Sequence, residues 1–64
     1  MYIVFYKTND VFIAEEIFEN KNINCKVVPT PVQDKAYCGV CIRINIDEEL
    51  VIELLKEIEY KIIQ

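Results

Sequence analysis

Histidine is absent from this sequence of 64 residues. Histidine-based metal sites, Ser-His catalysis and Cys-His catalysis are therefore excluded. Basic residues are also few, because 7 Lys and Arg stand against 11 Asp and Glu and give a formal net charge of −4 at pH 7. Binding to a phosphate backbone depends on clustered Lys and Arg, so we expect no nucleic-acid partner.

Long hydrophobic runs are missing as well. No apolar stretch approaches the roughly 20 residues that cross a bilayer, and residues 1–6 lack the basic leader and the small-residue cleavage site of a signal peptide. We therefore expect no membrane partner and a cytoplasmic location. The cysteines number 3, so they cannot all pair within the chain, and in a reducing cytosol they should be free thiols.

Apolar residues, in contrast, are plentiful and make up 53% of the chain. They suffice for a single small domain over residues 1–64. Period-two and helical-period patterns predict six elements in the order βαββαβ. The strands are expected at residues 2–6, 23–28, 40–46 and 59–63, and the helices at about 9–20 and 48–57.

The first helix is expected to start at Thr8 or Asn9, either of which can cap its free N–H groups. Its apolar stripe at helical spacing consists of Ile13, Ala14, Ile17 and Phe18. Asp47 is expected to cap the second helix. The residues expected to face inward from the second helix are Leu50, Val51, Leu54 and Leu55.

This order predicts an α+β fold, a ferredoxin-like βαββαβ sandwich in which two helices cover one face of a four-stranded antiparallel sheet. Right-handed crossovers place the first and third strands side by side in the middle. The end of the first strand, the start of the first helix and the loop between the second and third strands then share one end of the domain. We therefore expect Cys38, at the end of that loop, to lie near Lys7, Thr8 and Asn9.

A short motif, YCGVC at residues 37–41, leads into the clearest alternating strand. Gly39 is the only glycine of the chain, and its missing side chain lets a partner approach the neighbouring sulfur. Free N–H groups at the start of the first helix could favour the thiolate of Cys38, which is the nucleophilic form. Lys7 or Lys35 could add positive charge. The alternative is that Cys38 is a small hydrophobic residue that closes the core.

Cys38 and Cys41 have the Cys-x-x-Cys spacing of redox and soft-metal sites. Side chains three positions apart on a regular strand point to opposite faces, so the two thiols converge only if Cys38 lies in the turn. They do not complete a zinc site within one chain, because no His or third nearby Cys joins them. Cys25 lies in an alternating strand and is expected to be structural, near Ile42 rather than near Cys38.

The sheet face away from the helices is expected to be unusually apolar. Its expected residues are Tyr2, Val4, Tyr6, Val28, Ile63 or its neighbours, Lys26, Cys41 and Arg43. A contiguous patch of this kind usually marks a partner surface, so we expect a homodimer formed through this open sheet face. The alternative is that amphipathic tyrosines lie between Lys and Arg stems on a solvated face.

Five features recur in order along the chain: a Thr-Asx helix start, an acidic Ala-Glu helix, a Pro-containing segment, a Cys-Gly-aliphatic motif and an alternating strand with Arg. They are Thr8-Asn9-Asp10, Ala14-Glu15, Val28-Pro29-Thr30-Pro31, Cys38-Gly39-Val40 and Ile42-Arg43. With these features the chain resembles the small bacterial domains of the selenium/sulfur carrier protein-like family. The resemblance covers nearly all of the chain.

The resemblance implies that Cys38 is a carrier thiol that holds sulfur or selenium as a persulfide or selenopersulfide. Gly39 would give access, and Arg43 would steady the site or a partner. The implied partners are sulfur or selenium donor and acceptor proteins, and we expect no cofactor, no resident metal and no enzymatic turnover. Cys41 departs from the family pattern, which more often has a small apolar residue there, and would be a resolving thiol or a simple substitution.

Two alternatives stay open. The first is a soft-metal chaperone that binds copper or zinc through Cys38 and Cys41. The second is a non-catalytic interaction or regulatory module, a role that ferredoxin-like folds often have.

Overall fold

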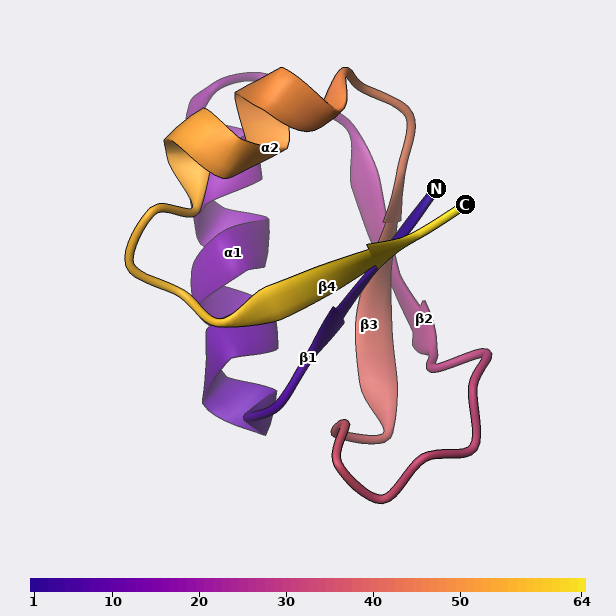
Figure 1. Cartoon of the computed structure of the whole chain (residues 1–64). Coiled ribbons are helices and arrows are strands. Elements are labelled where there is room, and N and C mark those ends of the chain that lie inside the picture. Colours follow the sequence, from indigo (N-terminus) through magenta and orange to yellow (C-terminus); the bar gives the residue numbers. More distant parts are fainter.

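The computed structural model describes residues 1–64 and has the predicted order of elements (Figure 1). The elements are β1 (Tyr2–Phe5), α1 (Thr8–Asn20), β2 (Cys25–Pro29), β3 (Val40–Ile44), α2 (Glu48–Leu54) and β4 (Tyr60–Ile63). The four strands form one antiparallel sheet in the order β2-β3-β1-β4. This topology confirms the α+β ferredoxin-like sandwich, with the first and third strands adjacent in the middle.

The start of α1 differs from the prediction. Thr8 is already helical and the N-cap residue is Lys7, which makes no side-chain capping hydrogen bond. The prediction that Thr8 or Asn9 caps the helix is therefore wrong. The first turn is closed by the backbone instead, where Asp10 N donates to Lys7 O at 3.1 Å.

Later elements are shorter than predicted. Asp47 is the N-cap residue of α2 as expected, but the helix has only 7 residues. The chain turns after it, with Ile58 N donating to Leu55 O at 3.2 Å. β2 starts at Cys25, because Asn22 has a left-handed φ of 59° that redirects the chain after α1.

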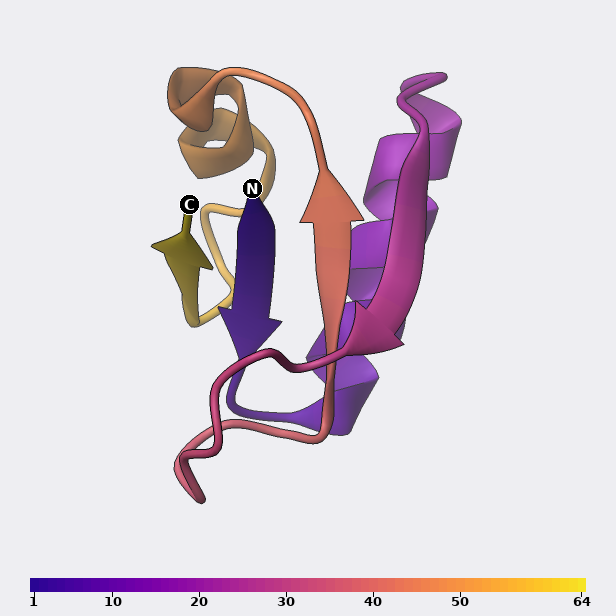
Figure 2. The ribbon, with the colours of Figure 1, turned by 90° about the vertical axis from the view of Figure 1, so that its right-hand side faces the viewer.

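Both helices lie on one face of the sheet (Figure 1), and Figure 2 shows the sheet from its other, open face. α1 packs along β1, β2 and β3, whereas α2 lies near the end of the sheet where the two chain termini meet (Figure 1). Neither helix has the length and apolar character needed to span a lipid bilayer. The core between the layers consists of Ile3, Phe5, Val11, Ala14, Phe18, Ile42, Ile44, Val51 and Leu55.

The buried side of α1 is only partly the predicted one. Ala14 and Phe18 are buried as expected, together with Val11. Ile13, which was expected in the apolar stripe, is 49% exposed. The prediction for Ile13 is therefore wrong, because the helix turns its 11-14-18 side to the sheet.

On the open face, strand register aligns two rows of side chains. The first row is Lys26, Arg43, Tyr2 and Ile63, and the second row is Val28, Cys41, Val4 and Lys61. Val4 and Cys41 are fully buried there, while the three cations of the two rows are exposed. The predicted members of this face are thus found in these rows except Tyr6, which follows β1 and packs against Tyr37. The homodimer expected to form through this face stays a prediction.

Candidate functional site

The loop between β2 and β3, residues 30–39, projects from the end of the sheet at which α1 begins (Figure 2). Two hydrogen bonds hold Cys38 at the end of this loop. Cys38 N donates to Phe5 O at 2.8 Å, and Thr30 Oγ1 donates to Cys38 O at 2.8 Å. The backbone of Cys38 is therefore fixed between the last residue of β1 and the residue that follows β2.

The side chain of Cys38 is half-buried, with one side against the core. Its Sγ donates to Val40 O at 3.0 Å. Its other side lines a shallow hollow of about 480 Å³. The loop residues that line this hollow with it are Thr30, Val32, Gln33, Asp34, Lys35, Tyr37 and Gly39. The thiol is thus held by the protein and can still be reached from solvent.

The surroundings of Cys38 match the prediction in part. Its backbone bond to Phe5 places it at the end of β1, close along the chain to Lys7 and the start of α1. Lys35 lines the same hollow, but Lys7 does not. The hydrogen bond of the thiol goes to Val40 O rather than engaging an N–H group of α1, so the expected help from the helix in forming the thiolate stays a prediction.

Gly39 next to this thiol is exposed. Its φ is not positive, and a Cβ built on it would meet no atom within 4 Å. The fold itself therefore does not require glycine at this position. The expected role of Gly39 in giving access to Cys38 stays a prediction.

Cys41 lies on the other side of β3 from Cys38. It pairs with Val4 of β1 and Val28 of β2 on the open face, is fully buried, and its Sγ contacts Pro29 O at 3.8 Å. The two thiols of the Cys-x-x-Cys motif thus engage different carbonyl groups. No group of three or more His, Cys, Asp or Glu side chains gathers anywhere in the chain to hold a metal ion.

Burial raises the pKa of the Cys41 thiol above the ordinary value of 9.0, the polar side chain of Thr30 lowers it in part, and the nearby Cys38 raises it further. Above pH 9.0 the native state therefore keeps a proton that the unfolded state has lost, so stability falls as pH rises. We expect Cys41→Ala to lower the free energy of unfolding by about 1 kcal/mol and to make its decline above pH 9.0 shallower. Urea unfolding at a series of pH values measures this, and an equally steep decline in the variant would contradict it.

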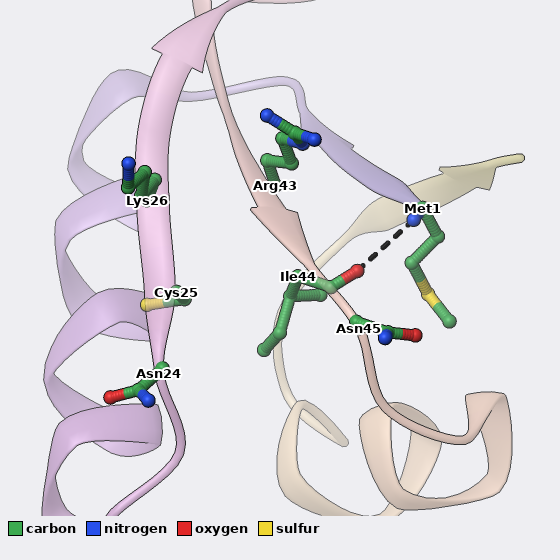
Figure 3. A pocket seen from close by; sticks show the side chains of 7 residues that line it. All are labelled: Met1, Asn24, Cys25, Lys26, Arg43, Ile44 and Asn45. Carbon is green, nitrogen blue, oxygen red and sulfur yellow. Dashed lines mark hydrogen bonds between the residues drawn. The ribbon is translucent and has the colours of Figure 1, made fainter.

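Cys25 occupies a structural position, although not the predicted one. It pairs with Ile44, two positions beyond the expected neighbour Ile42, and it packs against the core. Figure 3 shows its sulfur on the α1 side of β2. Burial raises the pKa of its thiol, and the carboxylates of Glu15 and Glu19 raise it further, which makes this cysteine a poor nucleophile near neutral pH.

Arg43 is not brought together with Cys38. It is exposed on the open face and lines a different hollow. Five positions along an extended chain separate the two residues by on the order of 15 Å. The structure therefore does not support a role for Arg43 in steadying the thiol and leaves it facing outward, where a partner could contact it.

Two residues of the loop contribute to the site beyond those expected. The Thr30 hydroxyl donates to Cys38 O, and the Tyr37 ring packs against Tyr6 with 5.2 Å between ring centroids. Thr30 could have been found from the hairpin register, because Pro29 pairs with Val40 and the next residues of the two strands are then Thr30 and Gly39. The Tyr37 contact depends on the path of the loop and has no signal in the sequence.

The whole length of the chain matches one protein family. The family model described as "Putative Se/S carrier protein-like" covers residues 1–64. Comparison with curated proteins and comparison with solved structures both give no match. The family match extends over every element of the fold and over the loop that holds Cys38. The chain therefore belongs to the Se/S carrier protein-like family.

Proposed function

We propose that this protein carries a sulfur or selenium atom on Cys38 and passes it from a donor protein to an acceptor protein. The atom is held as a persulfide or selenopersulfide, and the protein has no catalytic turnover of its own. The observation that carries the proposal is the position of the Cys38 thiol, fixed at the end of a loop and open to a hollow. Membership of the Se/S carrier protein-like family supports a carrier of sulfur or selenium.

Loading of Cys38 is a displacement at sulfur. The Cys38 thiolate attacks the outer sulfur of a persulfide on the donor, a new S–S bond forms, and the bond between the two donor sulfur atoms breaks. The donor leaves as a thiolate, so atoms and electrons balance without an oxidant or a reductant. Unloading is the same reaction, in which an acceptor thiolate attacks the outer atom and Cys38 leaves as a thiolate.

The hydrogen bond from Cys38 to Val40 O exists only while the thiol is protonated. A carbonyl oxygen repels a thiolate, so the reacting side chain is expected to rotate from Val40 O toward the hollow. Lys35 and Asp34 both line that hollow, so their formal charges balance there. Gly39 is exposed next to Cys38 and has no side chain, which favours the approach of a partner's reacting cysteine.

Cys41 has a packing role in this proposal rather than that of a resolving thiol, because it is fully buried. Arg43 is available to contact a docked donor or acceptor. The proposed location is the cytoplasm, where reducing conditions keep all three cysteines as free thiols.

The test is persulfide loading of the reduced protein. Incubation with a small-molecule persulfide should add one sulfur atom to the intact mass, and peptide mapping should place it on the peptide that contains Cys38. A reduced protein with a free cysteine should then take that atom from the loaded form. Failure to gain sulfur, or gain on Cys25 or Cys41 instead, would overturn the proposal.

The role of Gly39 gives a second test. Gly39→Ala should leave stability unchanged or raise it by about 0.4–1 kcal/mol, because alanine fits the backbone and restricts the unfolded chain. Loading by a small-molecule persulfide should be unaffected, whereas loading by a persulfidated cysteine desulfurase should slow several-fold. The rate with the small-molecule donor reports the reactivity of the thiol, and the rate with the protein donor reports access to it as well. Equal rates with the protein donor in the unaltered protein and in Gly39→Ala would show that Gly39 has no part in access.

A further inference from the structure

A second hollow lies at the other end of β3 from the loop that holds Cys38. Figure 3 shows it, with Lys26 on β2 and Arg43 on β3 at one end. The hollow has a volume of about 710 Å³. Its lining residues are Met1, Asn24, Cys25, Lys26, Arg43, Ile44 and Asn45.

The pairing of the two cations is unfavourable for the fold. Lys26 and Arg43 are direct partners across the antiparallel strands, and like charges in that position destabilise a sheet. The remaining members of their row are Tyr2 and Ile63, so no carboxylate in the row offsets the repulsion. Two positive charges are therefore held side by side on a chain whose net charge is −4.

The lining of the hollow is rich in hydrogen-bond donors. Beyond the two cations it contains the carboxamides of Asn24 and Asn45 and no carboxylate. The amino group of Met1 also lies there but already donates to Ile44 O at 3.0 Å (Figure 3). An arginine fork and an ammonium on adjacent strands are donors that bind oxyanions.

We infer that this hollow binds a tetrahedral oxyanion of the phosphate and sulfate class. Two adjacent cations match the charge of a dianion, whereas a single carboxylate would neutralise only one of them. The bound anion would remove the repulsion between Lys26 and Arg43. The site is separate from the hollow at Cys38, because Cys38 does not line it, and of its residues only Arg43 also enters the proposed carrier function, as a contact for a partner.

The inference is tested by nuclear magnetic resonance titration of the ¹⁵N-labelled protein with inorganic phosphate and with sulfate, at an ionic strength held constant with chloride. We expect saturable shifts of the amide signals of residues 24–26 and 43–45, with sodium chloride alone giving none. Arg43→Gln should weaken phosphate binding about tenfold, the effect of losing one charge-assisted hydrogen bond. Because Arg43 is exposed, we expect the substitution to leave the fold intact.

Lys56→Gln is the matched control, because it removes one exposed positive charge outside the hollow. It should leave phosphate binding unchanged. Equal weakening by the two variants, or shifts that do not saturate, would overturn the inference. Acetate that binds as tightly as phosphate would also overturn it, since the site would then select carboxylates rather than tetrahedral oxyanions.

Discussion

Replacement of Cys38 by serine is expected to abolish sulfur loading, from one atom per chain to none. Serine keeps the size of the side chain and can donate to Val40 O as the thiol does, so the fold should be retained. Its hydroxyl remains protonated near neutral pH and is a far weaker nucleophile than a thiolate. Intact-mass measurement after incubation with a persulfide donor gives the loaded fraction directly.

The other two cysteines supply the controls for this experiment. Cys25→Ser and Cys41→Ser should load as the unaltered protein does, because burial raises the pKa of both thiols and favours their protonated forms. Cys41→Ser also examines the resolving role. A longer lifetime of the persulfide in that variant would show that Cys41 attacks Cys38, and full loading of Cys38→Ser would remove Cys38 as the carrier.

The fold could be predicted from the sequence because local pattern and chain topology agree in every element. Alternating residues mark β3, and its position beside β1 follows from the right-handed crossovers of a βαββαβ chain. The boundaries of the helices could be predicted less accurately. The cap of α1 depends on the backbone angles of Lys7, and these are set by the turn after β1 rather than by the identity of Thr8 or Asn9.

In the candidate site, too, the strand positions could be predicted from the sequence and the local contacts could not. Strand parity places Cys38 on the core side and Cys41 on the open face before any coordinates are considered. The bond from Cys38 Sγ to Val40 O depends on a side-chain rotamer, and the contact of Tyr37 with Tyr6 depends on the path of a loop. Neither has a signature in residue type or spacing.

The inner face of α1 shows why the sequence pattern alone does not predict which side of a helix is buried. Apolar residues surround more than half of this helix, so several stripes fit the helical period. Ile13 lies about 200° around the axis from Val11 at roughly 100° per residue, and the two cannot both face the sheet. Packing against three strands selects the side with Val11 and Phe18.

That selection predicts a large loss of stability for Phe18→Ala. Phe18 is fully buried in the core, and removal of a buried phenyl group costs about 3–5 kcal/mol. A domain of 64 residues is expected near the lower end of the usual range of stability, about 5 kcal/mol. We therefore expect most of the free energy of unfolding to be lost, as measured by urea denaturation followed by circular dichroism.

Phe12→Ala is the matched control, since Phe12 lies on the same helix but is 53% exposed. The same atoms are removed and the same gain in helix propensity is made, so the difference between the two variants reports burial alone. We expect Phe12→Ala to change stability by no more than about 0.5 kcal/mol. Because Phe18→Ala raises the population of unfolded chain, Cys41 should be alkylated faster in Phe18→Ala than in Phe12→Ala, where it should stay protected. Equal destabilisation by both variants would contradict this and would mean that α1 presents a different side to the sheet.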